Sequence, residues 1–138
     1  MTGIADPGVL VAFANRRDTH FPWAFALAEH ISEPLLTCEA VLAETAYHLR
    51  NSDLVLRFLE TGLVRLAFEI EGHRSELSQL ARRYADRQPD LADLCLIRMS
   101  ELNPQLSVIT VDGDFRVYRR NRREIIPVIM PPDGRQTG

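Results

Sequence analysis

The chain has 138 residues, 46% of them hydrophobic, which is enough for one domain with a buried core. Its net charge is −3, and all sixteen basic residues are arginine. The absence of lysine excludes a P-loop nucleotide-binding site and Schiff-base catalysis, because both require a lysine side chain.

Nothing in the sequence predicts export or membrane insertion. The N-terminus has no basic leader before an apolar run, and no apolar segment reaches the roughly 18 residues that a spanning helix needs. Cys38 and Cys95 lack the spacing of a zinc or thioredoxin motif. We interpret both as reduced packing residues and expect a cytoplasmic protein.

The first half of the chain alternates short apolar runs with helical patterns. Met1–Ala5 is predicted to be a strand, and Asp6-Pro7-Gly8 turns it into a helix over Val9–Asn15. The elements predicted next are a helix from about Thr19 to Ile31, a strand over Pro34–Thr37, a helix over Glu39–Leu49, a helix over Ser52–Thr61 that Ser52 caps and Gly62 ends, and a small strand over Leu63–Leu66.

The second half continues this alternation and ends in a tail. Its predicted elements are an amphipathic helix over Glu71–Ala85, an apolar helix from Asp90 to about Asn103, a buried strand over Leu106–Val111, a short basic helix after Asp114, a strand over Ile125–Ile129 that Pro127 interrupts, and a flexible tail over residues 131–138. Strands that alternate with helices predict a three-layer α/β/α sandwich with a mostly parallel central sheet, formed by residues 1–130.

Acidic side chains follow several of these strands. Asp6 ends the first strand, and Asp112 and Asp114 follow the Leu106–Val111 strand. Glu44 lies on the helix that leaves the second strand. Ligands of open α/β sheets bind at the carboxyl ends of the strands, so we expect these acids at one edge of the sheet.

Asp90 and Asp93 open the apolar helix and share one of its faces, because they are three residues apart. One interpretation is capping alone, with Asp90 at the N-cap and Asp93 near the positive end of the helix dipole. This helix follows another helix, so the strand rule does not place its start. If it begins at the same edge, four acidic sites distant in sequence form one pocket.

Clustered carboxylates without arginine partners repel one another, and a divalent cation relieves that repulsion. Oxygen ligands without histidine or cysteine indicate Mg²⁺ or Mn²⁺ rather than zinc. Such an ion orients a phosphodiester and activates water for in-line attack, so the substrate inferred is a phosphate ester. Arginines at positions 116, 119, 120, 122 and 123 follow Asp114 and provide a cationic rim.

Each candidate also has a purely structural interpretation. Asp6 can begin a turn, and Glu44 can be a solvated helix residue. Glu39 suits the first turn of its helix, and Asp114 can cap the basic helix. The arginine cluster can be an exposed helix face. The histidines lack the spacing of a metal-binding motif, so surface or core positions are predicted for His20, His30, His48 and His73. A core position is also predicted for the aromatic stripe Phe21, Trp23 and Phe25.

The order of the acids resembles that of the PIN-domain nucleases, and within them the VapC-like toxins of bacterial toxin–antitoxin pairs. The likeness covers roughly Ile4 to Val128. One departure is Pro7, which stands where the family usually has Ser or Thr after the first acid. The motifs that carry the likeness are Ile4-Ala5-Asp6, Glu44 in Val-Leu-Ala-Glu-Thr, Asp90-Leu-Ala-Asp93, and Thr110-Val-Asp112-Gly-Asp114-Phe.

The resemblance implies an endoribonuclease that depends on Mg²⁺ or Mn²⁺. It also implies a homodimer that a small antitoxin, encoded beside it, holds inactive; the aromatic stripe then suits an antitoxin groove. The residues implied as metal ligands and catalytic groups are Asp6, Glu44, Asp93 and Asp112, with support from Asp90, Asp114 and Thr110. RNA contacts are predicted from Arg116, Arg119 and Arg120.

Three other functions stay open at this point. A signalling receiver domain also gathers acids around magnesium, but it resembles this chain poorly because it uses a lysine. A PIN fold that has lost its activity would be a binding module, and Pro7 keeps this alternative open. A housekeeping RNA-processing nuclease would use the same acids as a toxin.

Overall fold

The computed structural model describes residues 1–132, and residues 133–138, the end of the predicted tail, lie outside them. Within this range the central sheet has five strands in the order β3-β2-β1-β4-β7, and every neighbouring pair is parallel. The predicted parallel sheet is therefore confirmed. Its strands are β1 (Ile4–Ala5), β2 (Leu35–Thr37), β3 (Val64–Leu66), β4 (Val108–Ile109) and β7 (Val128–Ile129).

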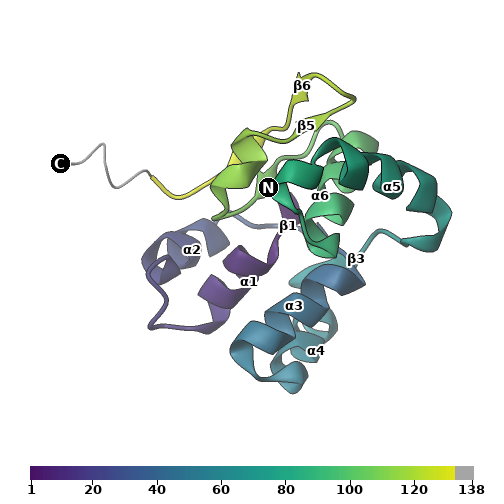
Figure 1. The fold of residues 1–138 in the computed structure, drawn as a ribbon. Coiled ribbons are helices and arrows are strands. Elements are labelled where there is room, and N and C mark those ends of the chain that lie inside the picture. The colour runs from purple at the N-terminus through teal and green to yellow at the C-terminus, as the bar shows by residue number, and fades with distance from the viewer. Residues whose placement is uncertain (133–138) are drawn as a thin grey trace.

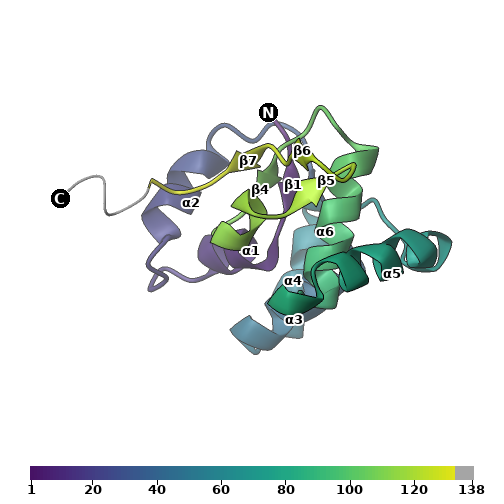
Figure 2. The ribbon, with the colours of Figure 1, turned by 45° about the horizontal axis from the view of Figure 1, so that its top comes forward.

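Helices flank the sheet on both sides, which gives the predicted three layers. In Figures 1 and 2, α1 and α2 lie on one side of β1, and α5 and α6 lie on the other. Within residues 1–132, no helix is both long and apolar enough to cross a membrane. The helices are α1 (Pro7–Ala14), α2 (Phe21–Ala28), α3 (Glu39–Leu49), α4 (Ser52–Glu60), α5 (Arg74–Arg83) and α6 (Leu91–Leu102), with 3₁₀ turns η1 (Glu71–His73), η2 (Ala85–Arg87) and η3 (Gly113–Arg116).

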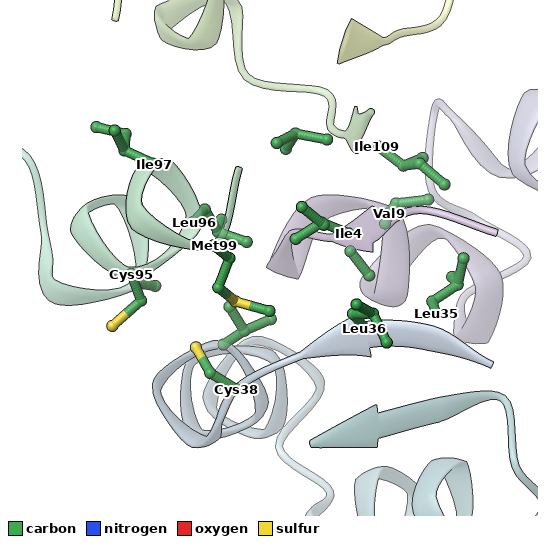
Figure 3. Close-up of a cluster of buried hydrophobic side chains, with 14 of the residues drawn as sticks. Ile4, Val9, Leu35, Leu36, Cys38, Cys95, Leu96, Ile97, Met99 and Ile109 are labelled. Carbon is green, nitrogen blue, oxygen red and sulfur yellow. The ribbon is translucent and has the colours of Figure 1, made fainter. Parts of the chain in front are cut away.

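The core lies between β1 and its neighbours and the helix α6. Both residues of β1 are fully buried, as expected for a parallel strand covered on both faces. Helix α6 is apolar around most of its circumference, which is typical of a helix inside a fold. Figure 3 shows Leu96 and Met99 of α6 between that helix and the strands that carry Ile4 and Leu36. Burial of α6 fixes its first residues, Asp90 to Asp93, beside the sheet.

The two cysteines are buried where α3 begins beside α6, as the sequence predicts for packing residues. Figure 3 shows their side chains on neighbouring segments, Cys95 on α6 and Cys38 at the start of α3. A hydrogen bond between them lowers the pKa of Cys38 and raises that of Cys95. This contact joins the helix that carries Glu44 to the helix that carries Asp93.

One helix start and the capping residue of another helix differ from the prediction. The first helix begins at Pro7 rather than Val9, since the Asp6 side chain accepts a hydrogen bond from the Val9 backbone N–H. Helix α4 is capped by Asn51 and not by Ser52, because the Asn51 side chain accepts from the Leu54 backbone N–H. Helix α2 is shorter than predicted and spans Phe21–Ala28, with a proline in its first turn.

The basic helix predicted after Asp114 is wrong. A 3₁₀ turn, η3, is followed by an antiparallel hairpin of β5 (Arg119–Arg120) and β6 (Glu124–Ile125). The connection is made by Asn121, Arg122 and Arg123, and the φ angles of the first two are 48° and 72°. Two successive positive φ angles are typical of tight hairpin turns, and asparagine accepts such a conformation readily.

The predicted last strand is split in two by Pro127. Ile125 pairs with Arg119 in the hairpin, whereas Val128 and Ile129 join the central sheet beside β4. Proline has no N–H to donate, so it marks the point where the chain leaves one sheet for the other.

Candidate active site

The sheet brings its acids together at the point where the strand order reverses. The chain passes from β1 to β2 and β3, and then returns to β4 on the other side of β1. Ligands of open α/β sheets bind at the carboxyl edge at such a reversal. A pocket of about 500 Å³ lies there, and its lining includes six carboxylates from five chain segments: Asp6, Asp18, Glu44, Asp90, Asp93 and Asp112.

Asp6 is the most deeply buried of these acids and is fixed by two donors. One oxygen, Oδ1, accepts a hydrogen bond of 2.9 Å from the Val9 backbone N–H. The other, Oδ2, accepts a hydrogen bond from the Thr110 hydroxyl. That hydroxyl in turn accepts from the Asp112 backbone N–H at 2.9 Å. Thr110 therefore connects the acid after β1 with the acid after β4.

Burial raises the pKa of Asp6 to about 6, and the negative charge of Asp112 adds to this effect. The hydrogen bonds from Thr110 and Val9 act in the opposite direction, because they stabilise the ionised carboxylate. Pro7 supplies no hydroxyl at the start of α1, so the described hydroxyl contact to Asp6 comes from Thr110 across the sheet.

The start of α6 shows that capping and a place in the pocket are compatible. Asp90 caps the helix by accepting from the Asp93 backbone N–H at 2.8 Å. The Asp93 side chain lines the pocket and accepts a long hydrogen bond of 3.5 Å from the Tyr118 hydroxyl. Burial, and then the charges of Asp90 and Asp112, raise the pKa of Asp93 to about 7.

Glu44 lies on α3, and its side chain lines the pocket. The alternative interpretation, in which Glu44 is only a solvated helix residue, is therefore not supported. Burial and a hydrogen bond shared with Asp90 raise its pKa to about 7, and the charges of Asp93 and Asp6 contribute. Glu39, at the first turn of the same helix, is exposed and lies beside a different hollow near Cys38. Its interpretation as a helix-start residue is the one that the structure supports.

The two acids after β4 have different surroundings. Asp112 lines the pocket, and its carboxylate accepts from the Asp114 backbone N–H at 2.9 Å. Asp114 is not part of the pocket lining; its carboxylate forms an ion pair with Arg87 at 3.2 Å. The partner Arg87 lies on η2, far away in sequence, which is why sequence reasoning missed it.

The predicted RNA-binding arginines also separate. Arg116 is exposed on η3, and the guanidinium of Arg119 donates to three nearby backbone carbonyls. The prediction is contradicted for Arg120, which is 4% exposed. Its guanidinium donates to the Ser100 carbonyl at 3.0 Å and to Glu124 at 2.6 Å, so it holds the hairpin against α6.

Three pocket residues were not predicted from the sequence: Asp18, His20 and His48. His48 lies four residues after Glu44, and this spacing places both on one helix face, so the sequence contained a signal for it. His20 and Asp18 come from the connection between α1 and α2, whose course is set by tertiary packing. In the described lining, the two histidines are the residues that can carry positive charge.

The pocket therefore concentrates negative charge with no arginine in its described lining. Among residues 1–132, no three His, Cys, Asp or Glu side chains stand close enough together to hold one metal ion between them. The oxygen donors are nevertheless those that Mg²⁺ prefers, and Mg²⁺ keeps several water ligands and uses one or two carboxylates directly. The donor chemistry fits a hydrated ion.

Gly8 is expected to tolerate no side chain, because the segment that follows β4 approaches α1 closely there. A Cβ atom at this position would lie 2.3 Å from Cγ2 of Val111 and 3.5 Å from Oδ1 of Asp6. We expect Gly8→Ala to lower the free energy of unfolding by about 1–3 kcal/mol, as overpacking does. Urea denaturation measures this loss. Adding Val111→Ala should recover part of it, and an additive double variant would contradict the steric explanation.

Comparison with known proteins agrees with this geometry. Curated proteins give no match to the chain. The family model for the PIN domain matches residues 4–121, which run from β1 into the β5–β6 hairpin and include all six carboxylates of the pocket. Members of this family are generally nucleases. Because the match covers most of the 138 residues, the chain belongs to the PIN-domain family.

Proposed function

We propose that this protein is an endoribonuclease that depends on Mg²⁺ or Mn²⁺. The observation that carries the proposal is the convergence of Asp6, Glu44, Asp93 and Asp112 in one pocket, where burial and mutual repulsion raise the pKa of three of them. Without a cation, such a set of carboxylates lowers the stability of the folded state, because each ionised carboxylate repels its neighbours.

In this proposal the ion would be held by Asp6, Asp93, Asp112 and Glu44, one or two of them as direct ligands and the others through its bound water molecules. When bound, it polarises the phosphoryl oxygen and activates water for attack on phosphorus. Thr110 fixes the orientation of Asp6, and Asp90 fixes the start of α6. Asp114 supports the site indirectly, because its backbone N–H orients the Asp112 carboxylate.

Cleavage of a mixture of structured RNAs by the purified protein tests the proposal. Cleavage should require added Mn²⁺ or Mg²⁺ and should stop when a chelator is added. Folded protein that leaves every RNA intact and gives no heat on titration with Mn²⁺ would favour the inactive binding module. Mn²⁺ binding without cleavage would instead indicate a very selective RNA target.

The metal-free protein should become more stable as the pH falls from about 8 to about 5. The native pKa values of Asp6, Glu44 and Asp93 are about 6, 7 and 7, above the values of 3.8 and 4.5 for unfolded Asp and Glu. The native state therefore binds protons more readily, and stability rises as the pH falls through this window. Scanning calorimetry with chelator present measures the effect.

Added Mn²⁺ should remove most of this pH dependence, because the ion replaces the protons. The contribution of Glu124 to the pH dependence has the opposite sign, since its hydrogen bond from Arg120 lowers the pKa of Glu124 to below this window. A melting temperature that falls steadily from pH 8 to pH 5 in chelator would contradict the proposed repulsion among the pocket acids.

The toxin role is the finer part of the proposal. It rests on the order of the acids and on the aromatic stripe of α2, where Phe25 is 60% exposed and its ring lies 5.6 Å from that of Phe21. An apolar antitoxin segment would cover this stripe, and the proposed toxin would be a homodimer. Expression should arrest growth, and co-expression of a small neighbouring gene should relieve it. A housekeeping nuclease would need no such gene. Analytical ultracentrifugation measures whether the protein is the proposed homodimer.

A further inference from the structure

Two chain segments leave the carboxylate pocket, and both carry arginines. The first runs backward from Asp90 through η2 into the end of α5, with Arg87, Arg83 and Arg82. The second runs forward from Asp112 through η3 into the β5–β6 hairpin, with arginines at 116, 119, 122 and 123. Positive charge therefore increases along both segments with distance from the acids.

Specific contacts hold these segments side by side. Arg87 of the first pairs with Asp114 of the second at 3.2 Å. Farther from the pocket, the Tyr84 hydroxyl accepts from the Arg119 backbone N–H at 2.8 Å, and its ring packs edge-on against Tyr118 with centroids 5.1 Å apart. Beyond this contact, Arg83 and Arg122 line one hollow between α5 and the hairpin.

We name Arg83, Arg87, Arg116, Arg119 and Arg122 the arginine track. Of these, Arg83, Arg116 and Arg122 are exposed and form no salt bridge within residues 1–132. Two acids, Glu76 and Glu101, also line the hollow at its end. Glu101 is already engaged, because it accepts from Arg98 at 3.0 Å and from the Asn121 backbone N–H at 2.7 Å.

We propose that the arginine track holds the phosphate backbone of the RNA whose scissile bond enters the carboxylate pocket. This deepens the proposed nuclease function and rests on it for the identity of the ligand. A pocket lined by acids repels a polyanion, so binding energy has to come from outside the pocket. Arginines on phosphates supply it by releasing counterions, and their planar guanidinium groups suit phosphate oxygens.

The test compares two double variants that remove the same charge. Arg83→Gln with Arg122→Gln alters the arginine track, whereas Arg65→Gln with Arg74→Gln alters exposed arginines of β3 and of the opposite end of α5. Fluorescence anisotropy in chelator measures the binding of a labelled single-stranded RNA without cleavage. Each lost phosphate contact should reduce the slope of log K against log salt by about 0.7, which is about 5-fold in affinity at 0.1 M salt.

We expect the Arg83/Arg122 variant to bind roughly 25-fold more weakly than the wild type, with a slope smaller by about 1.4, and the control pair to lose little. Equal losses of RNA affinity in the two double variants, or an unchanged affinity in the Arg83/Arg122 variant, would overturn the proposal. The second result would indicate that these arginines bind an acidic protein partner instead. Hydrolysis of a small chromogenic phosphodiester by the wild type tests the nuclease separately. If it fails while RNA binding depends on Arg83 and Arg122, the arginine track stands and the nuclease does not.

Discussion

Asp93→Asn should abolish metal-dependent RNA cleavage while leaving the protein folded. Asp93 lines the pocket from the first turn of α6, and its pKa of about 7 reports burial beside Asp90 and Asp112. The amide keeps the shape of the side chain but loses the charge that holds a cation. Metal ions supply several kcal/mol of transition-state stabilisation, so we expect a rate loss of about 1,000-fold or more.

The Asp93→Asn variant should lose activity without losing stability. In chelator at neutral pH the variant should melt no lower than the wild type, because one of several mutually repelling charges has been removed. Asp86→Asn is the matched control, since Asp86 is an exposed acid on η2 outside the pocket. Full cleavage by the Asp93→Asn variant, or an equal loss in the control, would exclude Asp93 as a metal ligand.

Thr110→Val should weaken both the fold and metal binding. Thr110 is fully buried, and its hydroxyl donates to Asp6 and accepts from the Asp112 backbone N–H. Valine has nearly the same shape but leaves both partners unsatisfied, which costs about 1–3 kcal/mol in the free energy of unfolding. Loss of the hydroxyl also raises the pKa of Asp6 further, so protons compete better with the ion.

By analogy with other residues that orient metal ligands, we expect the affinity for Mn²⁺ to fall about 10- to 100-fold. Calorimetric titration with Mn²⁺ and urea denaturation measure the two effects. Thr110→Ser should restore both, because it keeps the hydroxyl. Thr45→Val is the control: Thr45 is equally buried, but its hydroxyl donates to the Val41 carbonyl within α3. Metal affinity that falls equally in both valine variants would show a general effect of packing.

The architecture and the placement of the acids could be predicted because they follow from short-range rules. Asp6 and Asp112 each follow a buried apolar strand, and parallel strands end at one edge. The position of Asp93 could only be stated conditionally, since the start of α6 is set by its burial against β1 and not by a preceding strand.

Other features depend on contacts between distant segments, and the sequence does not display these. The hairpin turn at Asn121 and Arg122 is hidden within a run of arginines that resembles an exposed helix. The burial of Arg120 becomes visible only when Ser100 and Glu124 are placed around its guanidinium. His20 enters the pocket through the path of a loop, which local patterns do not determine.

The contact between Asp6 and Thr110 also determines when the site can exist during synthesis. The two residues are 104 positions apart, so the first acid leaves the ribosome long before its partner is made. The central strand β1 lacks its neighbour β4 until residue 109 has been added. A nascent chain of the proposed nuclease therefore carries an incomplete pocket until Asp112 has been added, and the messenger RNA and ribosome beside it meet no assembled site before that point.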